Sequence, residues 1–334
     1  MAIIFFNFYF GSIYIDHPKG KVHALRFGKG PGLLIALHGF GDRARMFAVL
    51  AEALSAEYTT IAIDLPFHGQ TEWREKTFTK ADLLEIVSAT LVADAEQGSA
   101  IKAAERGSAT EAAGRGSATE VAERGSATEA AGRGSATKVA ERGSATEAAD
   151  TRFTLMGFSF GARFALAMLP ALQSRIDKLI LLSPDGINTR GMGLAVHTPM
   201  WMRRVLYRTL QKPDWFLNLL AAGRKMGVVP PLIQHFLAAN LSRPDRFQRT
   251  FGCWFALNDF YLRKRDIRAI WEKGAFPIDI YYGAKDEMIR FESVEKLVSG
   301  LPHVRLHKME EDGHRVVGEG LGKRMEILGG QDKP

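Results

Sequence analysis

Ser159 stands in a short stretch whose residue types could support nucleophilic catalysis. It lies at the centre of Gly157-Phe158-Ser159-Phe160-Gly161. Residues 152–156 have the apolar and β-branched content of a buried strand, whereas residues 163–169 predict a helix that ends at Pro170. The pattern therefore puts Ser159 at a sharp turn between a strand and a helix, where flanking glycines avoid Cβ clashes with both elements.

A nucleophilic serine needs a base, an acid that orients the base, and donors for the developing oxyanion. The chain contains a candidate for each role. His38-Gly39-Phe40-Gly41 follows the apolar run 33–37, Asp286 follows the strand-like segment 278–283, and His314 follows the strand-like segment 304–307. Ser159, Asp286 and His314 thus occur in the order nucleophile, acid, base.

Five segments together resemble the α/β-hydrolase family. They are residues 38–41, 64–69, 157–161, 283–286 and 313–314, and they extend over nearly the whole chain apart from one insertion. The resemblance implies that Ser159 is the nucleophile, His314 the base and Asp286 the orienting acid. It also implies that the backbone amides of Phe40 and Phe160 form the oxyanion hole. No cofactor and no metal ion is implied.

Asp185 is an alternative orienting acid, because it too follows a predicted strand, residues 176–182. We favour Asp286, which keeps the usual Ser, Asp, His spacing and lies on the strand before the histidine. His38 could be a rival catalytic residue, but a histidine just before the oxyanion loop is more often a structural hydrogen-bonding residue.

Asp64 and His68 could be mistaken for a catalytic pair, although Asp64-Leu65-Pro66-Phe67-His68-Gly69 has the composition of a turn. We therefore interpret them as turn residues. Phe67 stands where the family usually has glycine, and this departure predicts a reshaped pocket entrance.

Strands and helices alternate along much of the chain, which predicts an α/β fold with a mostly parallel, doubly wound sheet. Residues 13–15 and 22–27 predict an antiparallel hairpin at the sheet edge. The core is expected to comprise residues 1–97, 151–189 and 271–334. The other predicted core elements are strands at 33–37, 59–63, 276–282 and 304–307 and helices at 42–58, 79–96 and 292–301.

Residues 98–150 form a low-complexity insertion built from a nine-residue repeat that alternates between two versions. Ile101, Val121 and Val139 are its only branched aliphatic residues. So little apolar surface cannot offset the entropy of ordering, and the segment is predicted to be disordered. We expect a variant that lacks it to retain activity.

Residues 190–270 predict a helical cap, with helices near 199–210, 215–226, 231–241 and 246–262. This cap contains 14 Lys and Arg residues against 4 Asp and Glu residues. The excess is compatible with an anionic substrate or with weak contact between residues 202–208 and a membrane surface or anionic lipid. Its large apolar residues could line a substrate pocket: Met200, Trp201, Trp215, Phe216, Met226, Phe236, Trp254 and Phe255.

The composition is that of a globular protein, with 46% hydrophobic residues, a net charge of +7 and a pI near 9.4. No nucleic-acid-binding module accompanies the positive charge. The single cysteine, Cys253, excludes an internal disulfide. We interpret the apolar N-terminus as a strand, with a weak targeting segment as the alternative, and predict a cytoplasmic location.

The predicted function is a serine hydrolase that cleaves a carboxylic ester or related acyl bond of a small molecule, of the carboxylesterase or lipase type. A cofactor-free C–C hydrolase or lyase acting on an anionic substrate is one alternative. It is favoured by the basic cap and by Gly161-Ala162-Arg163, which resembles a segment of a menaquinone-pathway lyase. A catalytically silent binding protein with the same fold is the other alternative.

Overall fold

The computed structural model describes residues 9–96, 151–187, 197–212, 214–287 and 291–331. Residues up to 84 and from 152 onward form one structural unit. Residues 85–96 belong to a second unit and complete a helix over residues 80–96. The repeat insertion and the first eight residues lie outside the described residues, so the predictions made for them stay predictions.

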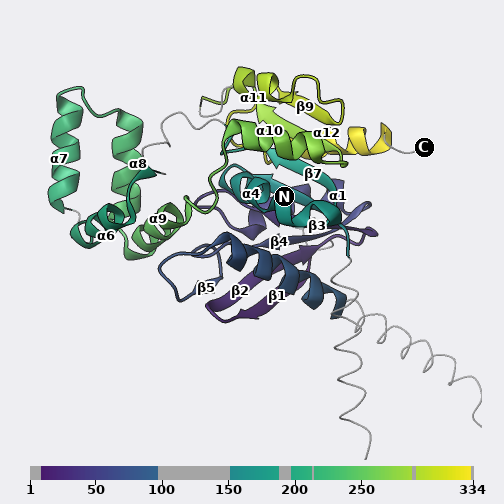
Figure 1. The fold of residues 1–334 in the computed structure, drawn as a ribbon, viewed down its shortest axis with the longest axis horizontal. Coiled ribbons are helices and arrows are strands. Elements are labelled where there is room, and N and C mark those ends of the chain that lie inside the picture. Colours follow the sequence, from purple (N-terminus) through teal and green to yellow (C-terminus); the bar gives the residue numbers. More distant parts are fainter. Residues whose placement is uncertain (1–8, 97–150, 188–196, 213, 288–290, 332–334) are drawn as a thin grey trace, which may run out of the picture. The chain divides into compact units, whose positions relative to one another are not determined.

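A single sheet, nine-stranded within the described part of the chain, organises the first unit (Figure 1). Its strand order is β1-β2-β4-β3-β6-β7-β8-β9, with β5 paired to β2. From β4 to β9 along this path, neighbouring strands pair in parallel, whereas β2 pairs antiparallel with β1, β4 and β5. The strand bounds are β1 Tyr9–His17, β2 Gly20–Phe27, β3 Gly32–Leu37, β4 Tyr58–Ile63, β5 Glu72–Trp73, β6 Phe153–Phe158, β7 Ile176–Leu182, β8 Ile278–Gly283 and β9 Val304–Met309.

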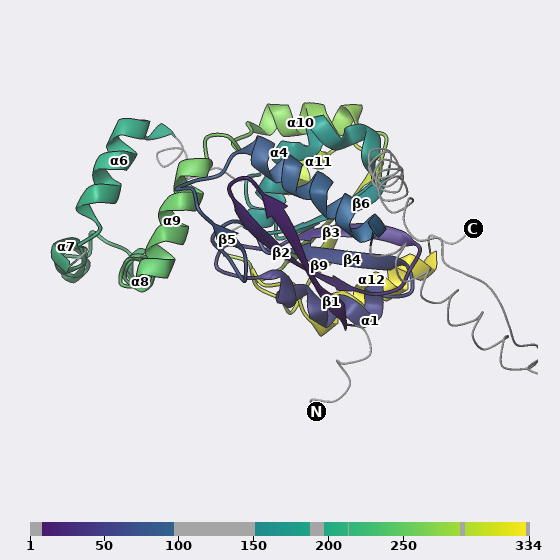
Figure 2. The same ribbon diagram turned by 90° about the horizontal axis from the view of Figure 1, so that it is seen from below.

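The central strands β3, β6 and β8 are buried on both faces of the sheet, because helices cover both (Figure 2). On one face, Leu34 and Ala36 of β3 join a core cluster with residues of η2 (Ala44–Leu50), α1 (Ala51–Leu54) and α12 (Glu319–Gln331). Helices α4 (Phe160–Leu172) and α10 (Lys264–Lys273) lie on the opposite face, with α11 (Phe291–Val298) packed against α10. A doubly wound α/β architecture was predicted and is confirmed.

Four helices form the cap: α6 (Met200–Thr209), α7 (Asp214–Lys225), α8 (Pro231–Leu241) and α9 (Pro244–Ala256). Figures 1 and 2 both show them together at one side of the sheet. They share an apolar cluster that includes Leu210, Leu241, Phe247 and Phe251. The cap therefore has a small core of its own, as the aromatic content of the segment indicates.

Three local predictions were wrong. The helix after Ser159 does not end at Pro170 but continues to Leu172, because a proline in the last turn removes few helical hydrogen bonds. Residues 42–58 form a 3₁₀ segment and one short helical turn rather than a continuous helix. The predicted helix 246–262 ends at Ala256, and α10 begins separately at Lys264.

None of the described helices combines the length and the apolar composition needed to cross a bilayer. Of the apolar residues predicted to line a cap pocket, several instead face solvent, among them Trp201, Trp215 and Met226. A cap pocket of about 530 Å³ is lined by other residues, including Tyr207, Leu217 and Phe247.

Candidate active site

Ser159 occupies a strained turn between β6 and α4. Its φ of 49° and ψ of −114° lie where a non-glycine residue is unfavourable, at a cost of about 1–3 kcal/mol. The turn is held from both sides, since the Ser159 amide donates to the Leu182 carbonyl at 2.8 Å and the Ala162 amide donates to the Ser159 carbonyl at 3.0 Å. A Cβ on Gly161 would lie 2.1 Å from the Leu37 carbonyl oxygen, so the helix can approach β3 only with glycine there.

A continuous hydrogen-bonded chain joins Ser159, His314 and Asp286. The Ser159 Oγ lies 2.8 Å from His314 Nε2, and His314 Nδ1 lies 2.9 Å from Asp286 Oδ2. An ionised carboxylate only accepts, so Nδ1 carries the proton and Nε2 is left to accept from the serine hydroxyl. The Asp286 side chain is fully buried and that of His314 is 25% exposed. The structure thus brings together the three residues whose order in the sequence pointed to a triad.

Close packing of two loops sets the Asp286 to His314 distance. Gly283 ends β8, and a Cβ on it would lie 2.0 Å from the Gly313 carbonyl oxygen. The Ala284 amide donates to the Met309 backbone carbonyl at 2.8 Å, and the Lys285 amide donates to the Asp312 backbone carbonyl at 2.9 Å. The Gly283 position therefore lets the acid's loop and the histidine's loop lie directly against each other.

Phe40 and Phe160, the predicted oxyanion-hole residues, lie side by side. Their ring centroids are 6.0 Å apart in an edge-to-face arrangement. His38 precedes this loop and is fully buried, with Nδ1 donating to the Gly39 carbonyl at 2.8 Å and Nε2 accepting from the Leu65 amide at 3.0 Å. Burial lowers its pKa, although the Gly39 bond opposes this. His38 is thus a neutral residue that ties the oxyanion loop to the loop after β4.

Asp185, the alternative acid, has a different partner. Its carboxylate forms a two-point ion pair with Arg163, through Nε at 3.1 Å and Nη2 at 2.9 Å. Arg163 is 2% exposed and lies on α4, just behind Ser159. The pair fastens the loop after β7 to the helix that carries the nucleophile, while His314 bonds to Asp286 instead.

The turn after β4 is built around Asp64. Its carboxylate bonds to His23 Nδ1 at 2.7 Å and accepts from the amides of Ala44 at 2.6 Å and Gln70 at 2.9 Å. These contacts agree with the turn interpretation. Phe67 has a φ of 68°, which is the physical reason that glycine suits this position.

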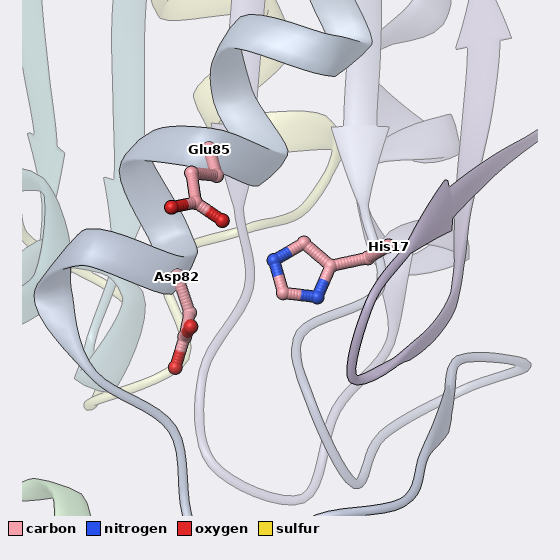
Figure 3. A group of neighbouring side chains, drawn as sticks. All are labelled: His17, Asp82 and Glu85. Atoms are coloured by element: carbon pink, nitrogen blue, oxygen red, sulfur yellow. The ribbon is translucent and has the colours of Figure 1, made fainter.

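Figure 3 draws His17 and Asp82 of the first unit together with Glu85, which belongs to the second unit. Within the first unit, Asp82 already has partners: Lys19 Nζ at 2.6 Å and the Thr79 amide at 2.8 Å. The Asp82 amide donates back to Thr79 Oγ1 at 3.2 Å, completing a reciprocal cap at the start of the helix. Burial alone would raise the pKa of Asp82, but these bonds lower it. Asp82 is therefore a capping and ion-pairing residue.

Sequence reasoning missed Arg249, which lies on α9 of the cap. Its guanidinium carbon is 5.6 Å from the centroid of the Phe40 ring. The only signal in the sequence was the basic excess of the cap, which does not single out one arginine among many.

A family model described as the alpha/beta hydrolase family matches residues 34–320. The match covers most of the chain and includes the elements that carry Ser159, Asp286 and His314. The chain belongs to the alpha/beta hydrolase family.

Solved structures share this alpha/beta hydrolase fold at low sequence identity. A thioesterase domain from the curacin biosynthetic pathway matches with a TM-score of 0.55 and 13% identity, covering 95% of this chain and 98% of that one. An esterase from Exiguobacterium antarcticum matches with a TM-score of 0.54 and 19% identity, covering 96% and 99%. Naproxen esterase from Bacillus subtilis matches with a TM-score of 0.52 and 13% identity, covering 98% and 93%. A comparison with curated proteins finds no match.

Membership of the alpha/beta hydrolase family supports hydrolase activity on a small molecule. At these identities, the solved structures show the fold, and the reaction has to be argued from the site itself.

Proposed function

We propose that this protein is a serine hydrolase that cleaves a carboxylic ester or related acyl bond through an acyl-enzyme on Ser159. The observation that carries the proposal is the hydrogen-bonded chain from Ser159 Oγ to His314 at 2.8 Å and from His314 to Asp286 at 2.9 Å. The partly exposed Ser159 and the buried Asp286 side chain are what such a mechanism needs: a nucleophile that substrate can reach and an acid that water cannot.

In the first half of the proposed reaction, His314 Nε2 takes the Ser159 hydroxyl proton as Oγ bonds to the substrate carbonyl carbon. The carbonyl oxygen becomes an oxyanion, which accepts hydrogen bonds from the Phe40 and Phe160 amides. Cleavage of the ester C–O bond follows, and the alcohol leaves with the proton that His314 held.

In the second half, His314 takes a proton from water, and the resulting hydroxide adds to the acyl carbon. Collapse of this second intermediate breaks the bond to Ser159 Oγ and returns the proton to the serine. Asp286 stays ionised throughout and stabilises the imidazolium that forms twice in the cycle. The products are one carboxylic acid and one alcohol, and no external oxidant or reductant is needed.

The two alternatives from the sequence have weaker support. Arg163, which favoured a lyase, is engaged by Asp185 in a two-point ion pair. A silent binding protein has no need for an aligned Ser159, His314 and Asp286.

The test is hydrolysis of a chain-length series of 4-nitrophenyl esters by the wild type and by Ser159→Ala. Loss of the nucleophile is expected to lower kcat by at least ~10⁴-fold. Ser183→Ala is a matched control, because Ser183 also has a positive φ, of 40°, and its buried Oγ has no hydrogen-bond partner within the described part of the chain.

Labelling by a fluorophosphonate probe gives a second measurement. We expect the wild type and Ser183→Ala to label and Ser159→Ala not to label. Equal turnover by the wild type and Ser159→Ala would refute the proposal, as would a folded wild type that neither labels nor hydrolyses any ester in the series.

A further inference from the structure

Arg249 places a positive charge directly over the loop assigned to the oxyanion hole. Its guanidinium carbon lies 5.6 Å from the centroid of the Phe40 ring, and that ring is 6.0 Å from the ring of Phe160, the residue after the nucleophile. A cation of the cap thus contacts the ring of Phe40, and that ring contacts the residue that follows Ser159.

Arg249 forms no ion pair with any residue that the structure describes, although the more distant charge of Asp245 acts on it. Its Nε is buried without a hydrogen-bond partner there. The nearest acidic residue along α9, Asp245, pairs with Arg243 at 3.3 Å. Burial lowers the pKa of Arg249, since a guanidinium removed from water is less stable when charged. A half-buried cation of this kind favours the binding of an anion.

Packing of α9 on the core holds Arg249 in this place. Gly252, three residues further along the same helix, lies so close to Phe67 that a Cβ would be 2.3 Å from the ring. The Thr77 hydroxyl donates to the Gly252 carbonyl at 3.2 Å. Residues three apart lie on the same face of a helix. Because the face at Gly252 packs against the core, Arg249 also points toward the core. The charge is therefore positioned by tertiary contacts rather than by a free surface side chain.

His68 supplies a second polar group without a partner at the same phenyl ring. Its side chain is buried, and its ring lies edge-on to Phe40 with centroids 5.9 Å apart. Nδ1 donates to the Pro66 carbonyl at 2.9 Å, whereas Nε2 is buried with no partner in the described residues. Burial, with His38 nearby, holds the pKa of His68 well below its usual value. Nε2 is therefore a free acceptor, suited to a hydroxyl or an ordered water.

We propose that Arg249 binds an anionic group of the substrate, a carboxylate or a phosphate, and that His68 Nε2 accepts a hydrogen bond from a hydroxyl or water beside it. This inference rests on the proposed function and narrows it to esters whose acyl or alcohol part carries a negative charge. The guanidinium has the planar, two-point donor geometry that suits both anions.

The first experiment measures binding without turnover, by calorimetry on the Ser159→Ala protein. The ligands have similar chains: methyl hexanoate, monomethyl adipate and methyl 5-phosphonopentanoate. We expect at least one anionic ligand to bind about 10-fold or more tightly than methyl hexanoate, as a charge-assisted contact would provide. The anionic ligand that binds more tightly, the carboxylate or the phosphonate, identifies the preferred anion.

Arg249→Gln in the same background should abolish this preference, and Arg249→Lys should restore part of it. Arg243→Gln is the matched control: it removes the same charge at the start of the same helix, but at a side chain that is 62% exposed. We expect this control to keep the preference. Thermal unfolding of each variant checks that the fold is intact.

The second experiment compares kcat/KM for 4-nitrophenyl hexanoate and mono-4-nitrophenyl adipate. Arg249→Gln should raise KM for the adipate ester and leave the hexanoate ester nearly unchanged. If Ser159-dependent hydrolysis occurs but neither anionic ligand is preferred, or if Arg249→Gln keeps the preference, this inference is wrong and the proposed function stands. If Arg249-dependent binding occurs but no ester is cleaved, the proposed function fails and the anion site stands.

Discussion

Exchanging Asp286 and Asp185 for asparagine in turn separates the residue that orients His314 from the residue that supports the nucleophile's helix. Both carboxylates follow a strand of the sheet and differ in their partners: Asp286 bonds to His314 at 2.9 Å, whereas Asp185 pairs with Arg163. Asparagine keeps the shape of each side chain and removes its charge. The two variants are therefore matched in chemistry and differ only in location.

Asp286→Asn is expected to lower kcat/KM by about 10⁴-fold, or about 5.5 kcal/mol of transition-state stabilisation. An amide can donate to His314 Nδ1, which would leave Nε2 protonated and unable to accept from Ser159. The stability cost should be about 1 kcal/mol, because asparagine keeps the shape of the side chain and weakens its hydrogen bond to His314.

Asp185→Asn should show the reverse pattern. Arg163 is 2% exposed, so loss of the Asp185 charge weakens a two-point ion pair of a buried cation. Removing one partner of such a pair costs about 3 kcal/mol, at the low end of the known range because Asp185 itself is 24% exposed. With an unfolding entropy of about 2.1 cal/mol/K per residue, a loss of about 3 kcal/mol lowers the Tm of a chain of this length by about 4–6 °C. Activity per folded molecule should fall by less than about 10-fold, since His314 keeps its partner.

The assay combines kcat/KM on 4-nitrophenyl butyrate with thermal unfolding followed by circular dichroism. Asp177→Asn is the surface control, because Asp177 is 52% exposed in its pair with Arg152 and should change neither quantity. The reasoning would be refuted if Asp185→Asn lost activity by about 10⁴-fold while Asp286→Asn stayed active.

Two further predictions concern stability. His38 and His68 have pKa values lowered first by burial, so the unfolded chain takes up protons below about pH 6.5 that the folded chain does not. The free energy of unfolding should therefore decrease as the pH falls, by up to about 1.4 kcal/mol per pH unit for each histidine. Urea unfolding measured between pH 8 and pH 5.5 should show a smaller decrease for His68→Gln than for the wild type. An unchanged slope in that variant would contradict this. Gly252→Val should lower the free energy of unfolding by about 1–3 kcal/mol, because its Cβ would meet the Phe67 ring. In a double-mutant cycle, Phe67→Ala should relieve much of that cost. If the losses of the two variants are additive, the contact is not the cause.

Much of the fold was predictable because the periodicity of apolar residues is a local signal. The strand Ile176–Leu182 and the helix over residues 80–96 are both where the sequence indicated. Local signals failed where neighbours decided the outcome. Helix α12 was missed because its glycine-rich sequence has weak helical propensity, and its position follows from the packing of Leu321 and Met325 in the core. The segment 42–58 has helical spacing, yet it becomes a 3₁₀ segment followed by a short turn.

The site divides in the same way. The motif around Ser159 was recognisable because a strand, a tight turn and a helix are specified by contiguous residues, and the order of Asp286 and His314 followed from their place after predicted strands. Only the tertiary structure brings Ser159 and His314, 155 residues apart in sequence, within 2.8 Å, and only it distinguishes Asp286 from Asp185 by giving each a different partner. The position of Arg249 was likewise decided by the tertiary structure alone, because nothing in its neighbouring residues marks it. The packing of Gly252 against Phe67 places the helix so that Arg249 lies over Phe40, and the role proposed for it follows from this position. Sequence determines what a residue can do chemically, but distance and burial, which come from the packing of remote segments, decide whether it does so.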